Sequence, residues 1–236
     1  MNNFYYSIPT KILFGKGQIE NLGRTVKQYG KRVLLIYGGG SIKKIGLYNK
    51  VIQQLDDNGV EVVELSGVEP NPRITTVNKG AQVCKEEGVD VVLAVGGGST
   101  LDCAKVVAAA ANYEGDAWDL VKDASKVKKV LPIITVLTLA ATGSEMDAYA
   151  VISNMETNEK LGTGHEEMKP KVSILDPEYT YSVSKYQTAA GTADIMSHVF
   201  EEYFERSEGA FLQNRMAEAI LKTCIKYGNC LLYTSD

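Results

Sequence analysis

The feature that most constrains the fold is the stretch of residues 91–105, VVLAVGGGSTLDCAK. Its five apolar residues, most of them β-branched, are typical of a strand that is buried on both faces. Three glycines end the strand, and Ser99 is the predicted N-cap of a helix over residues 101–111. A strand, a glycine turn and a helix start offer free backbone N–H groups and a positive dipole end to an anion. A tight turn without a ligand is the alternative explanation of this stretch when it is taken alone.

The same pattern occurs upstream, in residues 33–41 with the sequence VLLIYGGGS. Two turns with the same sequence pattern indicate two strands of one sheet whose C-terminal ends face the same ligand. Strands and helices alternate at short spacing around them, which predicts an α/β, Rossmann-like fold with a doubly wound parallel sheet. The predicted strands are residues 4–7, 11–14, 33–37, 60–65, 91–95, 130–137 (from Pro132) and 172–175, and the predicted helices are residues 18–29, 47–58 and 75–87.

The chain changes character after residue 177. Before it, residues 139–146 (LAATGSEM) predict a loop, and residues 148–153 and 160–163 predict a β-hairpin. After it, residues 187–205 and 209–227 predict two long helices, whereas residues 229–236 (NCLLYTSD) continue no pattern. We therefore expect an α/β domain over residues 1–178 and a helical segment over residues 179–236.

Composition narrows the function classes. Of the 236 residues, 44% are hydrophobic and 23% charged, which is ordinary for a globular protein, and the net charge of −4 argues against nucleic acid or an anionic membrane as a partner. The chain has no apolar run of membrane-spanning length, and its start lacks the features of a signal peptide. The four cysteines have no CxxC spacing, so we expect reduced thiols and a cytoplasmic protein.

A second group of polar residues lies in the predicted helix over residues 187–205, in the segment ADIMSHVF. Asp194 and His198 are four residues apart, so their side chains project from one face and can reach a common point. A carboxylate oxygen and an imidazole suit a divalent ion such as Fe²⁺ or Zn²⁺. A hydrogen bond on the helix surface is the commoner explanation of such a pair when it is taken alone.

Four segments together carry a resemblance to a known family: GGGSTLDCAK, ATGSEMD, MKPKVSILDP and QTAAGTADIMSHVFEEYF. From Phe4 to about Gly228, the chain resembles the iron-containing (group III) alcohol dehydrogenases, with the strongest likeness to their NADP(H)-dependent butanol dehydrogenase branch. The resemblance implies a dehydroquinate synthase-like fold with a cofactor domain and an all-helical metal domain. It also implies hydride transfer between NADP(H) and a primary alcohol or aldehyde such as butanol or butyraldehyde, with Fe²⁺ or Zn²⁺ as a Lewis acid.

The resemblance implies a role for individual residues. In such enzymes Asp194 and His198 would be two of four metal ligands. The implied cofactor residues are Gly97, Gly98 and Ser99 at the pyrophosphate, Asp102 in support of that loop, Thr138 and Thr142 at the nucleotide, Asn71 at its adenosine end, and Lys160 at the nicotinamide ribose.

The cofactor can also be argued from the residues. NAD-binding relatives place an acidic residue just after the first strand, and the corresponding position here is Gly39, within the turn Gly38, Gly39, Gly40 and Ser41. A carboxylate there would repel a 2′-phosphate, whereas glycine N–H groups and Ser41, with Lys43 and Lys44 nearby, would attract one. The sequence therefore predicts NADP(H) over NAD(H). A merely solvated helix face explains the two lysines equally well.

The chain departs from the family beyond residue 228. The resemblance implies that family members continue further and supply two more histidine ligands. The last residues, CLLYTSD, resemble translated adapter sequence, so we expect a C-terminally truncated gene fragment. We also expect exposed apolar faces on its last two helices. The full-length protein is expected to be a homodimer that acts on a small molecule and contacts neither nucleic acid nor membrane. A non-catalytic nucleotide-binding fragment and a glycerol dehydrogenase-like relative are the alternative functions.

Overall fold

The computed structural model describes residues 3, 5–205 and 209–233. The chain divides into two compact units. The first consists of Met1–Leu139 and Gly143–Tyr179, and the second of Ala140–Thr142 and Thr180–Asp236. Within the described ranges, no helix has the length and apolar character needed to cross a membrane.

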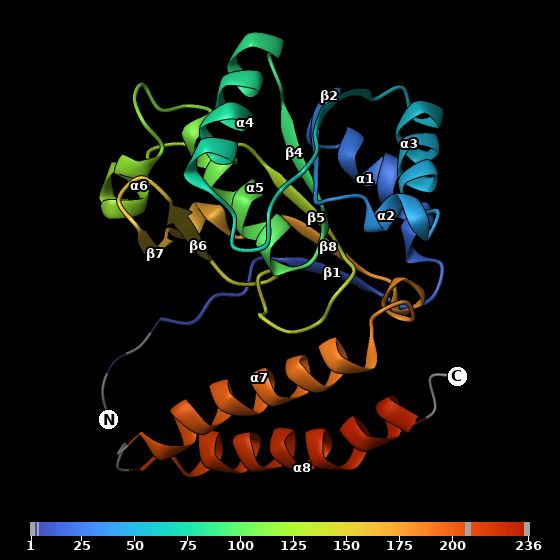
Figure 1. Cartoon of the computed structure of the whole chain (residues 1–236), viewed down its shortest axis with the longest axis vertical. Coiled ribbons are helices and arrows are strands. Elements are labelled where there is room, and N and C mark those ends of the chain that lie inside the picture. The colour runs from blue at the N-terminus through green and yellow to red at the C-terminus, as the bar shows by residue number, and fades with distance from the viewer. Residues whose placement is uncertain (1–2, 4, 206–208, 234–236) are drawn as a thin grey trace. The chain divides into compact units, whose positions relative to one another are not determined.

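The first unit is built on a parallel sheet (Figure 1). The sheet has six strands in the order β1-β8-β5-β4-β2-β3, and each neighbouring pair is parallel. This confirms the predicted α/β fold class, and it brings the C-terminal ends of β2, β4 and β5 to one edge of the sheet. The strands are β1 (Lys11–Phe14), β2 (Arg32–Tyr37), β3 (Glu61–Leu65), β4 (Val91–Gly96), β5 (Ile133–Leu137) and β8 (Val172–Leu175).

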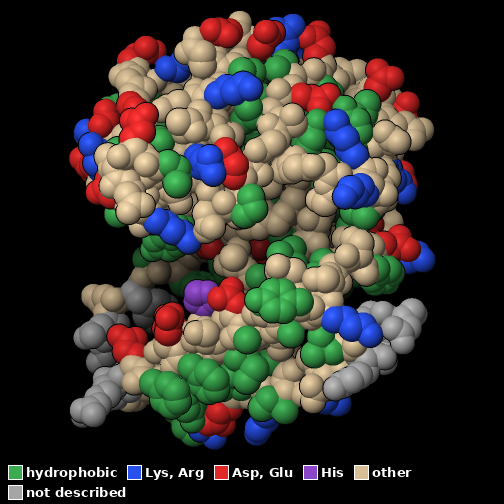
Figure 2. Space-filling model, in the orientation of Figure 1, with side chains coloured by type: hydrophobic (Ala, Val, Ile, Leu, Met, Phe, Trp, Pro, Cys, Tyr) green, Lys and Arg blue, Asp and Glu red, His purple; other side chains and the backbone are tan. Residues whose placement is uncertain are grey.

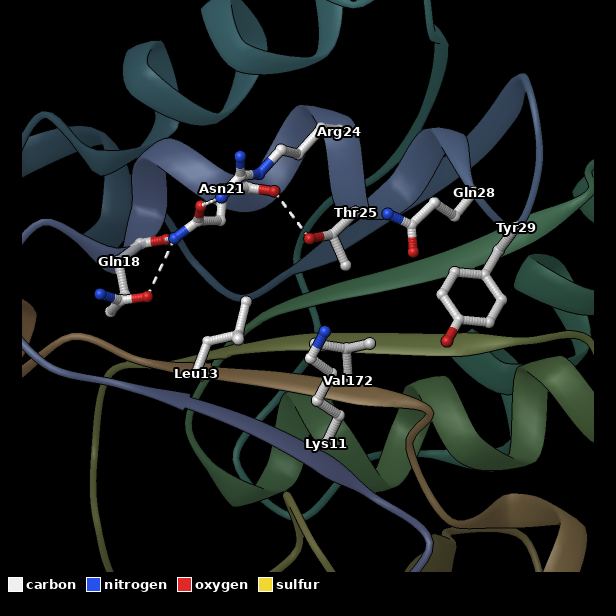
Figure 3. A pocket seen from close by; sticks show the side chains of 9 residues that line it. All are labelled: Lys11, Leu13, Gln18, Asn21, Arg24, Thr25, Gln28, Tyr29 and Val172. Carbon is white, nitrogen blue, oxygen red and sulfur yellow. Dashed lines mark hydrogen bonds between the residues drawn. The ribbon is translucent and has the colours of Figure 1, made fainter.

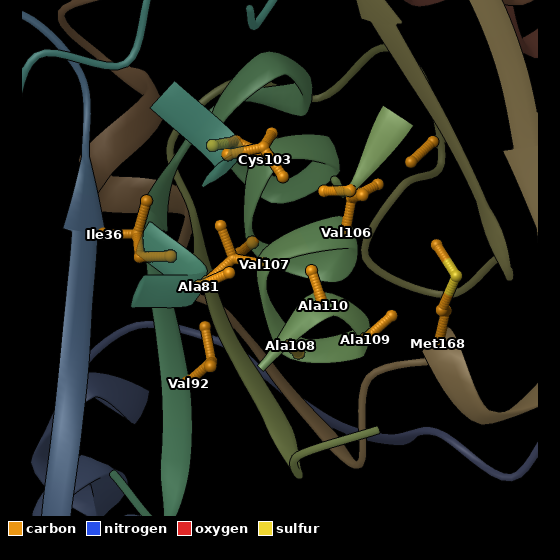
Figure 4. Packing of buried hydrophobic residues seen from close by; sticks show 14 of the residues in the cluster. Ile36, Ala81, Val92, Cys103, Val106, Val107, Ala108, Ala109, Ala110 and Met168 are labelled. Carbon is orange, nitrogen blue, oxygen red and sulfur yellow. The ribbon is translucent and has the colours of Figure 1, made fainter. Parts of the chain in front are cut away.

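Helices cover both faces of this sheet, and accordingly residues 33–36 of β2 and residues 91–95 of β4 are all apolar and buried. Alternate residues of β4 face opposite sides: Val92 and Ala94 pack with α4 (Ile74–Glu87) and α5 (Gly98–Ala110) (Figure 4). Val91, Leu93 and Val95 pack with α1 (Leu22–Lys27) and α3 (Leu47–Asp57). The small residues of α5, mostly alanine and valine, let it approach the sheet closely.

The remaining elements of the first unit are short. The predicted hairpin forms as the antiparallel pair β6 (Tyr149–Asn154) and β7 (Glu159–Gly164), with Ser153 opposite Lys160. The short helices are η1 (Gln18–Asn21), α2 (Ser41–Lys44), α6 (Trp118–Lys122), η2 (Ala124–Lys126), η3 (Glu166–Met168) and η4 (Pro177–Thr180).

The start of the chain differs from the sequence prediction. Residues 5–10 form no strand, and Phe4 lies outside the described residues. Pro9 cannot donate a backbone hydrogen bond, so pairing starts only at Lys11. The helix predicted over residues 18–29 is a 3₁₀ turn, Gln18–Asn21, followed by the short helix α1.

The start of α5 also differs. The helix begins at Gly98 rather than at residue 101, and its N-cap is Gly97, with no side-chain capping bond. The prediction of Ser99 as N-cap is therefore wrong. Ser99 lies in the first helical turn instead, which leaves its hydroxyl for another partner.

The second unit contains the helices α7 (Lys185–Phe204) and α8 (Phe211–Tyr233), which pack against each other. Ser184 caps α7, because its side chain accepts a hydrogen bond from the backbone N–H of Gln187. Helix α8 passes through Gly228 and continues to Tyr233, so the expectation that residues 229–233 continue no pattern is wrong; residues 234–236 lie outside the described part. Gly228 packs closely against α7, since a Cβ there would lie 3.0 Å from Cγ2 of Thr192.

Candidate functional site

The turn between β4 and α5 requires glycine for close packing. A Cβ on Gly96 would lie 2.6 Å from Oγ1 of Thr100, so a side chain there would displace the first turn of α5. Gly97 has an extended backbone, and a Cβ on it would lie 3.3 Å from that of Leu139. Gly98 and Ser99 then open a helix of 13 residues. Both residues are partly exposed, as an anion site at a helix N-terminus requires.

Three of the expected cofactor residues lie together beside this turn, although they come from three segments of the chain. The backbone N–H of Asn71 donates to Oγ of Ser99 at 3.3 Å, and Nζ of Lys160 donates to Oδ1 of Asn71 at 2.8 Å. Asn71 has a φ of 57°, a left-handed conformation that asparagine tolerates better than most residues. Three separate segments thus place a hydroxyl, an amide and an ammonium at the start of α5.

Asp102 ties α5 to the segments that follow β5. One carboxylate oxygen accepts from Oγ of Ser144 at 2.7 Å, and the other accepts from the backbone N–H of Val151 at 3.0 Å. Burial raises the pKa of Asp102 above its usual value, because desolvation outweighs these two hydrogen bonds and the nearby Lys105. The expected supporting role of Asp102 therefore has a visible set of contacts.

Lys105, one turn further along α5, was not singled out from the sequence. Its side chain is fully buried, and its Nζ donates to Oδ1 of Asp147 at 2.7 Å and to the carbonyl oxygen of Tyr149 at 2.8 Å. The available signal was that Lys105 is the one charged residue among the small apolar residues at positions 103–110 of α5. Lys105 and Asp102 together hold the β6–β7 hairpin, and thus Lys160, against the helix.

The second glycine turn follows β2 and lies next to the first. A Cβ on Gly38 would lie 3.4 Å from the carbonyl oxygen of Val68 and 3.8 Å from Oγ1 of Thr100, in the first turn of α5. Gly40 has a φ of 109°, which favours glycine, and open space surrounds the Cβ positions of Gly39 and Gly40. Ser41 is exposed and begins α2.

A polar cluster of Tyr37, Lys43, Tyr48 and Glu64 lies beside the second turn. Burial acts to raise the pKa of Glu64, but hydrogen bonds from the two tyrosine hydroxyls outweigh it and leave the pKa below its usual value. The hydrogen bond to Glu64, together with burial, raises the pKa of Tyr48 to about 12. Hydrogen bonding to Tyr37 raises the pKa of Lys43. The cluster thus places one acidic side chain, one basic side chain and two tyrosine hydroxyls beside the turn.

The two expected threonines differ in their placement. The backbone N–H of Thr138 donates to the carbonyl oxygen of Gly96 at 3.0 Å, so Thr138 lies directly beside the turn before α5. Thr142 belongs to the second unit, and the structure does not group it with the other expected cofactor residues.

The expected metal ligands lie on one exposed face of α7. Nε2 of His198 is 3.7 Å from Oδ1 of Asp194, and Nδ1 of His198 is 3.5 Å from Oε2 of Glu201. Two ligand atoms about 2.1 Å from one tetrahedral ion lie about 3.4 Å apart, so Asp194 and His198 fit as two members of a ligand set. The described residues contain no group of three or more His, Cys, Asp or Glu side chains placed for a metal.

A separate hollow of about 450 Å³ lies between α1 and β1 (Figure 3). None of the expected cofactor or metal residues lines it, so we do not assign the cofactor there. Its walls are formed by Lys11, Leu13, Gln18, Asn21, Arg24, Thr25, Gln28, Tyr29 and Val172.

Comparison with known proteins decides the family. The family model described as "Iron-containing alcohol dehydrogenase" matches residues 9–177. The chain belongs to the iron-containing alcohol dehydrogenases. It is 62% identical over 236 residues to a protein named NADH-dependent butanol dehydrogenase A from Clostridium acetobutylicum, and covers 61% of that protein. It is 43% identical over 231 residues to the NADPH-dependent aldehyde reductase YqhD of Escherichia coli, and covers 59% of it.

Solved structures of other iron-containing alcohol dehydrogenases share this fold. The chain is similar to the crystal structure of NADH-dependent butanol dehydrogenase A from Thermotoga maritima, with a TM-score of 0.96 and 46% identity. That match covers 100% of this chain and 59% of the other. The chain thus spans about 60% of the length of the relatives that it matches.

Proposed function

We propose that this chain supplies the nucleotide-binding part and two metal ligands of an NADP(H)-dependent enzyme that interconverts primary alcohols and aldehydes, such as butanol and butyraldehyde. The observation that carries the proposal is the contact of Asn71, Ser99 and Lys160 at the start of α5. A glycine turn with an adjoining ammonium and hydroxyl suits the pyrophosphate and ribose of a dinucleotide. The names of the butanol dehydrogenases among the relatives support the substrate class.

The residues of the first unit then have distinct roles. The backbone of Gly97 and Gly98 and the hydroxyl of Ser99 bind the pyrophosphate, while Lys160 binds the nicotinamide ribose through its ammonium. Asp102 holds the turn through its hydrogen bonds to Ser144 and Val151. When bound, the nicotinamide donates or accepts the hydride, and the protein contributes orientation and electrostatics.

Asp194 and His198 are proposed to hold part of the coordination sphere of a divalent metal ion, Fe²⁺ or Zn²⁺. Their donor atoms lie close enough to share one ion, and they carry one hard oxygen and one imidazole nitrogen. A metal bound there supplies Lewis-acid polarisation of the substrate oxygen. Their exposure, 46% for Asp194 and 62% for His198, leaves both side chains free to turn towards further ligands.

The preference for NADP(H) rests on the absence of a carboxylate among residues 38–41. The turn after β2 is three glycines and a serine, and open space around Gly39 accommodates a 2′-phosphate without steric conflict. NAD(H) is the second candidate, because four of the related butanol dehydrogenases are named NADH-dependent, while YqhD is named NADPH-dependent.

An assay of NADPH oxidation tests the proposed reaction. The purified chain, supplied with Fe²⁺ or Zn²⁺, is expected to bind NADPH, and consumption of NADPH on addition of butyraldehyde would support the proposed reaction. NADPH binding without turnover would support the alternative of a nucleotide-binding fragment. A folded chain that neither binds nor oxidises NADPH would contradict the proposed function.

The cofactor preference is tested by placing a charge at Gly39. Gly39→Asp is expected to weaken NADPH binding by about tenfold or more and to leave NADH binding much less affected, because the new carboxylate repels the 2′-phosphate. Gly39→Asn is the matched control, since it has the same shape without the charge. Equal loss of NADPH affinity in both variants would show that bulk rather than charge matters at this position.

A further inference from the structure

Lys43 is exposed, but its ammonium lies over two aromatic rings. Its Nζ lies 4.4 Å from the ring centroid of Tyr48 and 5.1 Å from that of Tyr37. The two rings are 5.7 Å apart, and Tyr37 is only 3% exposed, so they form a fixed support for the ammonium.

Glu64 provides a negative charge on the same pair of rings. Oε2 of Glu64 accepts from the hydroxyl of Tyr37 at 2.6 Å, and Oε1 accepts from the hydroxyl of Tyr48 at 2.7 Å. Each carboxylate oxygen thus accepts from one tyrosine hydroxyl, and Lys43 and Glu64 also interact through their charges. The two tyrosines fix both charges at one place.

This cluster adjoins the second glycine turn. Tyr37 is the last residue of β2 and directly precedes Gly38, while the backbone N–H of Lys43 donates to the carbonyl oxygen of Gly40 at 3.1 Å. Glu64 lies on β3, beside β2, where it is paired in register with Leu35. The ammonium and the carboxylate therefore flank the turn at which the proposed function places the adenosine ribose.

We propose that Lys43 and Glu64 act as a pair that sets the preference between NADP(H) and NAD(H). The proposal rests on the proposed function, because it assumes that the turn after β2 binds the adenosine ribose of the nucleotide. Lys43 attracts a 2′-phosphate, whereas Glu64 competes with that phosphate for the same ammonium. A ribose with a free 2′-hydroxyl needs neither interaction, so the pair acts on one cofactor and not on the other.

The experiment measures the dissociation constants of 2′,5′-ADP and 5′-AMP, which differ only in the 2′-phosphate, by calorimetric titration of the whole chain. Lys43→Met is expected to raise the dissociation constant of 2′,5′-ADP by about tenfold and to change the dissociation constant of 5′-AMP by less than about twofold. Glu64→Gln retains the size of the side chain and one of its two oxygen acceptors but removes the charge, and it is expected to strengthen binding of 2′,5′-ADP severalfold. Lys79→Met, on the exposed surface of α4, is the control and is expected to change neither constant.

A double variant tests whether Glu64 acts through Lys43 or independently of it. If Glu64 acts by restraining Lys43, Glu64→Gln is expected to have no effect on 2′,5′-ADP in the Lys43→Met background. Equal effects of Lys43→Met on both nucleotides, or the same gain from Glu64→Gln with and without Lys43, would overturn the proposal while the proposed function stands. A folded wild-type chain that bound neither 5′-AMP nor NADPH would overturn both.

Discussion

At the scale of single residues, Lys105 is the clearest case of a charge whose surroundings are specified. Its ammonium is buried, and the described contacts give it two acceptors, the carboxylate of Asp147 and the carbonyl oxygen of Tyr149. A buried charge is tolerated only when it is paired and hydrogen-bonded. Asp147 also accepts from the backbone N–H of Tyr149, so this carboxylate fixes the start of the hairpin as well as the lysine.

Removal of the Asp147 carboxylate tests this arrangement. Asp147→Ala leaves the buried ammonium with one acceptor, so we expect the free energy of unfolding to fall by about 2–4 kcal/mol. Asp147→Asn keeps an oxygen acceptor and is expected to cost less than half as much. Urea denaturation of the two variants provides the measurement. An equal decrease in the free energy of unfolding in both variants would mean that the contact between Asp147 and Lys105 contributes little to stability.

Asp102 predicts a pH dependence of stability. Its pKa is raised in the folded state, so the folded protein binds a proton more tightly than the unfolded chain does. Its contribution to stability is therefore fully present below the ordinary Asp pKa of about 3.9 and is lost as the pH rises through the higher folded value. Relative to Asp102→Asn, the wild-type chain is expected to lose stability as the pH increases across this window. A difference that is constant with pH, measured by urea denaturation, would contradict the raised pKa.

Individual site residues could be predicted from the sequence only where a local motif or the family resemblance indicated them. Asn71, Ser99 and Lys160 were expected through the resemblance, and the structure brings them into contact. The bonds of Tyr37 and Tyr48 to Glu64 were not predicted, because they depend on side-chain placement across separate elements. No local pattern encodes such a contact.

At the scale of elements, the strand, glycine turn and helix formed by β4 and α5 organise the first unit (Figures 1 and 4). The apolar strands and the hairpin were predictable, because periodicity and turn residues are local signals. The start of α5 was misplaced because glycine is a poor helix former, although Gly98 joins the helix here. Helix α8 was predicted too short because the prediction ended it near Gly228, which the packing against Thr192 accommodates within the helix.

The close packing at the β4–α5 turn gives a prediction for Gly96. Gly96→Ala places a methyl group 2.6 Å from Oγ1 of Thr100, so Thr100 or the turn before it must shift. We expect a loss of about 1–3 kcal/mol in stability and weaker NADPH binding. Gly162→Ala on β7 is the control, because open space surrounds its Cβ position. Thermal denaturation of both variants checks the difference, and similar melting temperatures would contradict the packing argument.

At the scale of the whole molecule, the chain combines an α/β unit that has its own two-sided core with a helical pair that exposes apolar side chains (Figure 2). On α8, Leu212, Met216 and Ile220 recur every four residues and are all exposed. Exposed apolar surface of this kind promotes association.

We therefore expect the chain to self-associate in a concentration-dependent manner, as measured by sedimentation velocity. The double substitution Leu212→Ser and Met216→Ser is expected to reduce this association, because it interrupts the apolar stripe. Lys222→Ser, on the same helix, serves as the control. A chain that stayed monomeric at all concentrations would contradict the expectation.

The central claim is that the first unit binds a nicotinamide dinucleotide phosphate at the start of α5, and calorimetric titration with NADPH tests it most directly. We predict a single binding event that Lys160→Ala weakens by about tenfold, because the ammonium beside Asn71 is lost, and that Lys79→Ala on the exposed surface of α4 leaves unchanged. Absence of binding by the folded chain, or equal affinity of the two variants, would contradict this claim.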